Sequence, residues 1–287
     1  MKKKITTLVV AVAMLSLGAL MLAGCSSSNA SSSAASSASS AADKAATETT
    51  KLVVGFDNAY PPYGFIGDDG KETGFDLDLA AEVAKRNGWE YEQQAIDWDA
   101  KDALLNQGTI NCIWNGFTME GREADYTFSE PYMLNEQVIV VKKDSDVKAL
   151  EDLAGKTVIT QVDSAALDVL ENDEEGGQAA LAATFAELQT IGDYNNAFMQ
   201  LESGMVDAVA CDLSIAAYQM AANPDAYVQI SEPLSSEHYA VGVKKGNTEM
   251  ADQITATLKE MYEDGTVEEL CKKYEEYGLT FDNWILK

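Results

Sequence analysis

The stretch GFDLDLAAEVAKRNG, residues 74–88, has the spacing of an amphipathic helix that ends at Asn87-Gly88. The apolar residues that recur on one helical face are Leu77, Ala80, Ala81, Val83 and Ala84. The apolar run LVVGF before this helix (52–56) and the alternating segment WEYEQQAID after it (89–97) each predict a strand. A strand, a helix and a second strand in this order indicate a β-α-β unit.

The same alternation continues along the chain. In the first half, a helix is predicted at 99–108, a buried strand at 109–116 and a strong strand at 137–143. The pattern then restarts, with a helical turn at 149–155, strands at 156–160, 186–191, 205–210 and 238–245, and helices at 164–172, 193–204, 213–222, 248–264 and 266–277. Because similar runs precede and follow 137–143, the sequence predicts an α/β fold with two open, mostly parallel sheets.

Length and charge limit the classes of function. The 287 residues are enough for two modest domains, and 47 acidic against 20 basic residues give a formal net charge of −27. Such a surface repels phosphate groups, so the sequence excludes a nucleic-acid role. Solubility alone also explains the charge, which therefore identifies no partner.

The N-terminus has the pattern of an export signal. Lys2, Lys3 and Lys4 precede a run of 20 mainly apolar residues that ends at Cys25. LAGC, residues 22–25, resembles a bacterial lipobox, which implies a signal peptide at 1–24 and a lipid on Cys25. The alternative is a retained transmembrane anchor, since the run is nearly long enough to span a bilayer. Residues 25–50 are rich in Ser and Ala and predict a flexible linker.

The remaining cysteines, Cys112, Cys211 and Cys271, are far apart in the sequence, and His238 is the only histidine. This spacing does not fit a zinc site, so we expect no metal and no cofactor. We expect three free thiols packed as small apolar groups. A catalytic Cys–His pair would require His238 to fold against one of them.

Polar and aromatic residues follow the predicted strands at their carboxyl ends. They are Asp57, Tyr60, Asp97, Trp98, Gly116, Thr118, Arg122, Gln161, Asp163, Ser164 and Asp212. In open α/β sheets, ligands bind outside these strand ends. The set suits an amino-acid zwitterion, because a guanidinium binds a carboxylate with two hydrogen bonds and Asp212 can accept from an ammonium group. Tyr60 and Trp98 would supply flat walls, and Asp57 would face the ligand's side chain.

Each of these residues also has a structural alternative. Arg122, one of only two arginines, could form a surface ion pair with Glu120 or Glu123. Asp57 could be a turn residue, Trp98 could lie in the core, and Asp212 could cap the following helix. Their common position after strands is what favours a binding site.

The residues together resemble the bacterial solute-binding proteins of family 3, the polar amino-acid receptors of ABC transporters. The likeness extends from Lys51 to Lys287. The segments that carry it are VVGFDNAYPPYGF, GFDLDLAAEVAKR, DWDA, NGFTMEGR with YTFSEPY, LEDLAGKTV, VDAVACD and GTVEELCKKY. The resemblance implies a two-lobe, type II periplasmic-binding-protein-like fold with hinge crossovers near 132–136 and 236–240. Lobe 1 would be 51–132 and 240–287, and lobe 2 would be 137–235.

The resemblance also assigns site residues. Arg122 and Thr118 match the carboxylate-binding residues, and Asp212 matches the aspartate for the α-ammonium group. Gly116 matches a backbone contact, and residues 164–166 with Gln161 match the loop of lobe 2. The full expected set is Asp57, Tyr60, Trp98, Asn115, Gly116, Phe117, Thr118, Arg122, Gln161, Ser164, Ala165 and Asp212.

Three positions depart from the family's pattern. The loop between Thr118 and Arg122 is one residue shorter than is common. Asp163 adds an acidic residue where many members have small ones, and Cys211 lies beside Asp212. These departures bear on which ligand is bound.

We therefore expect a monomeric, lipid-anchored extracytoplasmic receptor, not an enzyme, that passes a free L-amino acid to an ABC permease. Asp57, Asp97, Asp99 and Asp163 near the mouth favour a cationic or glutamine-like ligand over an acidic one, with cystine also possible. The other readings are an exported enzyme similar to cyclohexadienyl dehydratase and a sensor lobe of a signalling system.

Overall fold

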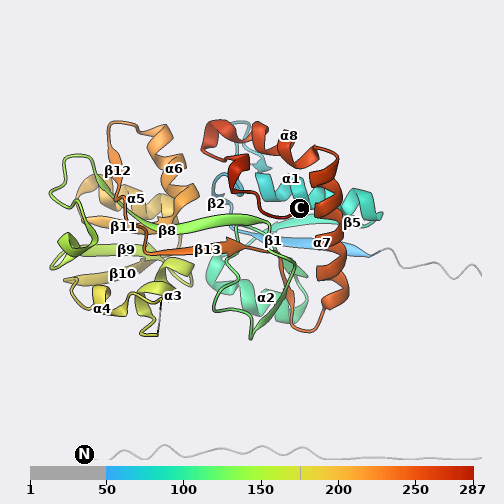
Figure 1. Ribbon diagram of the computed structural model, residues 1–287, viewed down its shortest axis with the longest axis horizontal. Coiled ribbons are helices and arrows are strands. Elements are labelled where there is room, and N and C mark those ends of the chain that lie inside the picture. The colour runs from blue at the N-terminus through green and yellow to red at the C-terminus, as the bar shows by residue number, and fades with distance from the viewer. Residues whose placement is uncertain (1–49, 175) are drawn as a thin grey trace, which may run out of the picture. The chain divides into compact units, whose positions relative to one another are not determined.

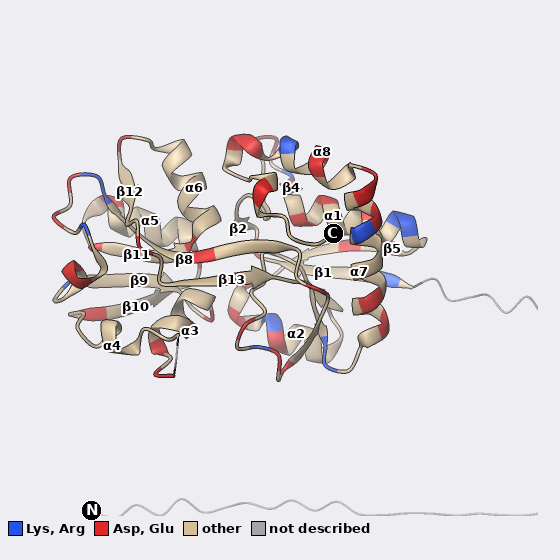
Figure 2. Ribbon diagram, viewed as in Figure 1, with Lys and Arg blue, Asp and Glu red and all other residues tan. Residues whose placement is uncertain are grey.

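The computed structural model describes residues 50–174 and 176–287. The predicted signal peptide, Cys25 and the linker as far as residue 49 lie outside these residues. In the described part of the chain, no helix combines the length and the apolarity needed to cross a membrane. Acidic residues lie on elements around both sheets described below, with fewer basic residues among them (Figure 2).

The first sheet takes its strands from both ends of the folded part. In spatial order, its strands are β5 (Glu90–Ala95), β1 (Lys51–Phe56), β6 (Cys112–Ile113), β14 (Gly242–Lys244) and β7 (Tyr126–Phe128). β1 is parallel to β5 and β6, whereas β14 is antiparallel to β6 and β7. Its helices are α1 (Phe75–Asn87), α2 (Lys101–Gln107), α7 (Thr248–Glu263) and α8 (Thr266–Lys273). The helices α1, α7 and α8 share one core, and α2 belongs to a second core on the other face.

The second sheet lies in the middle of the sequence. Its strands are β10 (Glu187–Ile191), β9 (Thr157–Gln161), β11 (Ala208–Asp212), β8 (Met133–Lys142) and β12 (Tyr227–Gln229), with β13 (Ser235–Tyr239) also paired to β8. Its helices are α3 (Ala165–Glu171), α4 (Ala179–Ala182), α5 (Tyr194–Ser203) and α6 (Leu213–Ala222). The pairs α3/α4 and α5/α6 contribute to different cores, so they cover opposite faces of the sheet.

β8 and β13 connect the two sheets (Figure 1). They pair antiparallel, with Asn135 opposite Glu237 and Gln137 opposite Ser235. Near the end of β13, Tyr239 forms a bridge with Thr118, which follows β6 of the first sheet. These two strands therefore carry the chain between the sheets beside the residues that follow β6.

The long strand β8 explains the apolar run at 137–143. Val138 and Val140 belong to one core, whereas Ile139 and Val141 belong to the other, and all four are buried. Because successive side chains of a strand point to opposite faces, a strand buried on both faces needs a continuous apolar run. Burying each of these side chains stabilises the fold by about 1.5–3 kcal/mol.

The structure differs from the predicted elements in several places. The sheets are mixed rather than mostly parallel, because β8, β12, β13, β14 and β7 run antiparallel to their neighbours. The strand predicted at 109–116 is only two residues long, and Gly116, three residues after it, has a left-handed backbone (φ 55°). The elements that the pattern did not predict are β2 (Ala59–Tyr60), β3 (Gly64–Ile66), β4 (Glu72–Thr73), β7, β12, α4 and η4 (Phe281–Asn283). The helix predicted at 266–277 is divided into α8 and the short η3 (Glu275–Tyr277), and the helix predicted at 99–108 is preceded by η1 (Trp98–Ala100). The predicted helical turn near 150 is η2 (Leu150–Leu153).

The three thiols of Cys112, Cys211 and Cys271 are free and buried, as predicted. Burial raises the pKa of each. His238 lies on β13, where its Nδ1 is 2.6 Å from Oε1 of Glu120, so it faces a carboxylate rather than a thiol. Within residues 50–174 and 176–287, a catalytic Cys–His pair is therefore not formed.

The entry into α1 depends on Gly74. A Cβ atom there would lie 2.0 Å from the carbonyl oxygen of Tyr63 and 2.8 Å from Cα of Gly64. These are backbone atoms at the start of β3, which cannot move without breaking the β2–β3–β4 sheet. We expect Gly74→Ala to lower the free energy of unfolding by at least about 2 kcal/mol, measured by denaturant unfolding.

The matched control is Gly192→Ala, since no atom lies within 4 Å of the Cβ position at Gly192. Its free energy of unfolding should stay within about 0.5 kcal/mol of the wild type. Equal stability of the two variants would show that the contact at Gly74 does not constrain the fold.

Candidate functional site

Ten of the twelve predicted site residues line one pocket, and every residue that lines it belongs to the predicted set. They are Tyr60, Trp98, Asn115, Gly116, Thr118, Arg122, Gln161, Ser164, Ala165 and Asp212. They follow β1, β5 and β6 of the first sheet and β9 and β11 of the second. The carboxyl ends of these strands thus meet at a single place, between the two sheets.

The two predicted residues outside this lining are Asp57 and Phe117. Asp57 is buried, and its Oδ2 accepts a hydrogen bond from Nε2 of the pocket residue Gln161 at 2.7 Å. Its Oδ1 accepts from the backbone N–H of Ala59, so Asp57 also stabilises a turn, which was the structural alternative for this residue. Burial raises the pKa of its carboxyl. Phe117 is fully buried, and its ring lies 5.1 Å from the guanidinium carbon of Arg122.

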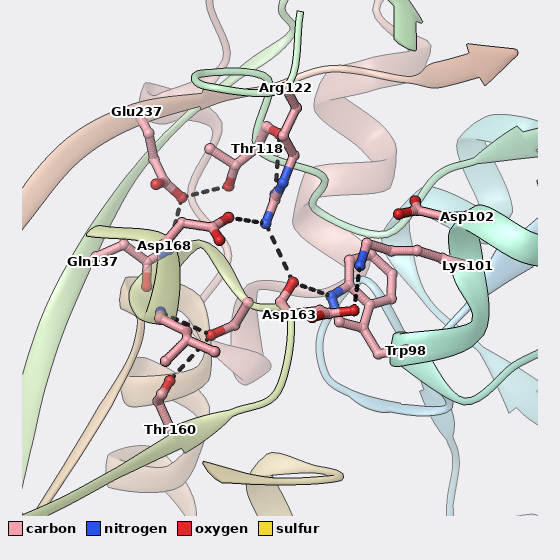
Figure 3. A network of polar contacts seen from close by, with 12 residues as sticks. Trp98, Lys101, Asp102, Thr118, Arg122, Gln137, Thr160, Asp163, Asp168 and Glu237 are labelled. Carbon is pink, nitrogen blue, oxygen red and sulfur yellow. Dashed lines mark hydrogen bonds and ion pairs between the residues drawn. The ribbon is translucent and has the colours of Figure 1, made fainter. Parts of the chain in front are cut away.

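Arg122 reaches across the pocket to the second sheet (Figure 3). Its Nη2 donates to Oδ2 of Asp168 at 2.7 Å and to the carbonyl oxygen of Asp163 at 3.3 Å. Its Nη1 donates to the carbonyl oxygen of Thr118 at 3.2 Å. The carboxylate partner is therefore Asp168 on α3, neither Glu120 nor Glu123. The guanidinium is oriented from both sides of the pocket.

Asp212 stands at the first position before α6, but its side chain forms no cap hydrogen bond. Its Oδ1 instead accepts from Asn135 at 3.0 Å, Gln137 at 2.6 Å and the hydroxyl of Tyr239 at 2.9 Å. The side chain is almost fully buried, which raises the pKa of its carboxyl. The capping alternative is therefore wrong, and the carboxylate is held at the pocket by side chains of β8 and β13.

Glu237 is a buried carboxylate that the sequence reading did not select. Its Oε1 accepts from Thr118 at 2.7 Å (Figure 3). It also accepts from Asn135 and Gln137 at 2.8 Å each. Burial, followed by the charge of Asp212, raises the pKa of Glu237 to about 7. Thr118 donates its single hydroxyl proton to Glu237, so in this arrangement it can only accept from a ligand. The alternation of a strand could have indicated its burial, because Glu237 lies two residues before buried Tyr239 and faces the same side of β13.

Trp98 is both core and pocket wall. Its ring packs edge-on against Phe117, and its Nε1 donates to the carbonyl oxygen of Asp163 at 3.1 Å. Asp163 has a left-handed backbone (φ 54°), and its carboxylate lies 3.5 Å from Nζ of Lys101. Lys101 is a further residue that the sequence reading missed. Its ammonium lies 5.3 Å from the ring centre of Trp98, and burial lowers its pKa.

Gly116 is fixed by a second missed carboxylate, Asp76 of α1. The backbone N–H of Gly116 donates to Oδ2 of Asp76 at 2.6 Å, and the hydroxyl of Tyr132 donates to both carboxylate oxygens. The N–H of Gly116 is thus engaged inside the protein and does not point to a ligand. Burial raises the pKa of Asp76 to about 7. Asp76 precedes Ala80, Val83 and Ala84 at helical spacing, which was the signal that it faces inward.

The loop after β9 completes the pocket. Ser164 begins α3, as predicted, and its Oγ accepts from the backbone N–H of Leu167 at 3.1 Å. Gln161 donates to Asp57 and also to the carbonyl oxygen of Gly192 at 2.9 Å. Asn115 accepts from the backbone N–H of Asp57, while its buried Nδ2 has no hydrogen-bond partner in the described residues. That amide is a donor that a ligand can satisfy. Cys211 is buried in β11 and does not line the pocket.

A second pocket adjoins the first one at Trp98, which lines both. Its acidic lining residues are Asp57, Asp97, Asp99 and Asp193. A cationic group there would face several carboxylates at short range, whereas an anionic group would be repelled. Residues 50–174 and 176–287 contain no group of three or more His, Cys, Asp or Glu side chains placed to hold a metal ion.

Two α/β sheets, two strands that run between them and a polar pocket at the facing strand ends define a two-lobe binding protein of the type II periplasmic kind. Residues 52–277 match the bacterial extracellular solute-binding proteins, family 3. The chain belongs to this family, which confirms the resemblance predicted from the motifs.

Individual relatives show the extent of the similarity. The chain is 29% identical over 230 residues to the L-cystine-binding protein TcyJ of Escherichia coli (strain K12), covering 79% of this chain and 83% of TcyJ. It is 30% identical over 268 residues to the ABC transporter glutamine-binding protein GlnH of Bacillus subtilis (strain 168), covering 91% and 95%. A crystal structure of an ABC uptake transporter substrate-binding protein from Streptococcus pneumoniae with bound histidine superposes with a TM-score of 0.74 at 33% identity, covering 78% and 92%.

Proposed function

We propose that this protein captures a free L-amino acid between its two lobes and delivers it to an ABC permease. The observation that carries the proposal is the convergence of one guanidinium, Arg122, and one buried carboxylate, Asp212, on the same pocket. These are the two charges that complement a zwitterion. The relatives named above bind cystine, glutamine and histidine, which share this zwitterionic group.

Arg122 would bind the α-carboxylate of the ligand, and Asp212 would accept from its α-ammonium group. Asp168 now occupies Nη2 of Arg122, so the ligand's carboxylate would displace Asp168 or take the remaining N–H groups. Thr118 would share the carboxylate once its hydroxyl turns away from Glu237. Tyr60 and Trp98 would form the walls around the ligand.

The remaining residues would read the ligand's side chain and close the site. Asn115 offers the unpaired amide group, and Asp57 lies behind Gln161 towards the acidic pocket. Ser164 and Ala165, at the start of α3, would contribute the contacts of lobe 2. Gly116 would contribute contact surface only, since its N–H is bonded to Asp76.

We place lobe 1 at 51–132 and 240–287 and lobe 2 at 137–235, with hinges at 132–136 and 236–240. Arg122 would then belong to lobe 1 and Asp212 to lobe 2. Because only a bound zwitterion engages both charges at once, the ligand would shift the equilibrium towards the closed form. Binding without turnover follows from this arrangement, so we propose a receptor rather than an enzyme.

We further propose that the protein is a monomer anchored by a lipid on Cys25 after removal of residues 1–24. The linker at 25–50 would then tether the lobes with a root-mean-square reach of roughly 25–30 Å. A lipid anchor of two or more acyl chains suffices for stable attachment to a membrane.

The acidic second pocket leads to a prediction about the ligand. We expect L-arginine or L-glutamine to bind at least about tenfold more tightly than L-glutamate, because a second ligand carboxylate would face Asp57, Asp97 and Asp99. Isothermal titration calorimetry of the purified protein with these ligands and L-cystine measures the order. Tighter binding of glutamate than of all three would contradict the charge argument, and no binding of any amino acid would contradict the proposed function.

A further inference from the structure

Two carboxylates are buried together where the strands cross between the lobes. Asp212 is 4% exposed and Glu237 is 3% exposed. The same two amide nitrogens, Asn135 Nδ2 and Gln137 Nε2, each donate to Oδ1 of Asp212 and to Oε1 of Glu237, at distances of 2.6–3.0 Å. The two carboxylate oxygens therefore lie side by side around shared neutral donors.

No cation compensates this pair within the described residues. Neither carboxylate is among the ion pairs of residues 50–174 and 176–287. The titratable side chains that face Asp212 are Tyr60, Tyr63, Tyr194, Tyr239 and Cys211. Burial raises the pKa of each of these groups, so all of them are neutral near pH 7.

Two further groups, Arg122 and His238, lie near the pair without contacting either carboxylate. Arg122 donates to the carbonyl oxygen of Thr118, whose hydroxyl contacts Glu237. His238, next to Glu237 on β13, is 42% exposed and bonds to Glu120. Ionising both of two neighbouring buried carboxyl groups, with no cation beside them, costs much more free energy than ionising one of them. Such a pair therefore keeps one proton at a pH at which exposed carboxyl groups have lost theirs. Burial and the charge of Asp212 raise the pKa of Glu237 to about 7, in agreement with this geometry.

We propose that Asp212 and Glu237 hold one shared proton in the empty site and release it to the solvent when the ligand's α-ammonium group binds at Asp212. The inference rests on the proposed function. The ammonium group brings the missing positive charge, so both carboxylates can then ionise. Glu237 acts through Asp212 and Thr118 and does not touch the ligand, so it is a positioning residue. Capture of the amino acid is thereby coupled to pH.

The expected result is a ligand affinity that falls as the pH falls through about 7, because protons compete with the ligand. Calorimetric titrations at pH 6, 7 and 8 use L-arginine, or L-glutamine if it binds more tightly. Binding should be about tenfold weaker at pH 6 than at pH 8. Repeating each titration in phosphate and in imidazole buffer, which both buffer across this pH range but differ in ionisation enthalpy, counts the protons. About one proton should be released per ligand at pH 6, and about a tenth at pH 8.

Two substitutions test whether the released proton comes from the pair of Asp212 and Glu237. Glu237→Gln keeps an oxygen that can accept from Thr118, Asn135 and Gln137, so binding at pH 8 should be preserved while the pH dependence and the proton release disappear. His238→Gln is the matched control, because it changes the only histidine of the chain, which is the neighbour of Glu237 on β13. It should keep the wild-type pH dependence.

The proposal is overturned if the wild type binds equally at pH 6 and pH 8, or if the heats do not depend on the buffer. It is also overturned if Glu237→Gln keeps the wild-type pH dependence or if His238→Gln loses it. Should Glu237→Gln fail to fold, the proton count of the wild type and of His238→Gln decides the question. If L-arginine, L-glutamine and L-cystine all fail to bind at every pH, the proposed function is contradicted, and the proposed proton release is contradicted with it.

Discussion

Arg122→Ala should weaken amino-acid binding by about 2–5 kcal/mol, which corresponds to a dissociation constant roughly 30-fold to several thousand-fold higher. The side chain is only 12% exposed, and among the residues that the structure describes no other guanidinium or ammonium group lines the pocket. Without it, the ligand's carboxylate would be buried opposite neutral groups and close to Asp168. Calorimetry at pH 8 measures the change directly.

The chain provides its own control, because Arg86 is the only other arginine. Arg86 lies at the end of α1 and pairs with Glu82 at 3.0 Å and Asp264 at 2.7 Å, away from the pocket. Arg86→Ala should lower the free energy of unfolding by about 1 kcal/mol or less and leave the affinity unchanged. Arg122→Lys should recover only part of the affinity, since an ammonium group lacks the two parallel N–H donors.

An affinity of Arg122→Ala close to that of the wild type would contradict the assignment. In that case, the ion pair with Asp168 would be the role of Arg122. A second variant separates the two roles, because Asp168→Asn removes the ion pair and keeps the guanidinium. Loss of affinity in Arg122→Ala but not in Asp168→Asn supports a contact with the ligand.

The pocket could be predicted because its residues follow strands. Parallel β-α-β units direct their strand ends to one edge of a sheet, so Tyr60, Trp98 and Thr118 gather at an edge of the first sheet and Gln161 lies at an edge of the second. That the two edges face each other was implied by the family resemblance and not by these local patterns. Asp212 was placed by the same rule at the end of β11. The helices and most of the strands could be predicted because burial of one face gives each element a regular spacing of apolar residues. Short strands such as β2 and β7 carry too few residues to show a period.

The partners of these side chains could not be predicted in the same way. Asp168 meets Arg122 across the two lobes, and Glu237 meets Asp212 through Asn135 and Gln137. Contacts of this kind depend on how the lobes approach one another, which no local pattern encodes. Buried carboxylates are also rare, so an acidic residue in a strand or helix is first read as exposed.

The stability of the ligand-free protein gives the second large effect, and its sign follows from burial. The pKa of Glu237 is raised from an ordinary value of 4.5 to about 7 in the folded protein. The folded state therefore holds the proton more tightly than the unfolded chain. This contribution is fully present below about pH 4.5 and is lost as the pH rises through 7. Glu237→Gln removes the titration, so at pH 8 the variant should be more stable than the wild type by up to about 3 kcal/mol.

Denaturant unfolding of both proteins without ligand at pH 5 and pH 8 measures this difference, which should fall to about 1 kcal/mol or less at pH 5. Asp76, also buried with a pKa of about 7, will leave a pH dependence in the variant, so the difference between the two proteins is the informative quantity.

The control is Glu120→Gln, an exposed change beside His238. Its free energy of unfolding should stay within about 0.5 kcal/mol of the wild type at both pH values. Thr118, Asn135 and Gln137 all donate to Glu237, and these three hydrogen bonds favour its ionised form. Burial favours the neutral form, so the measured difference in stability shows which effect is larger. A Glu237→Gln variant less stable than the wild type at pH 8 would show that the hydrogen bonds prevail and that burial does not raise the pKa of Glu237.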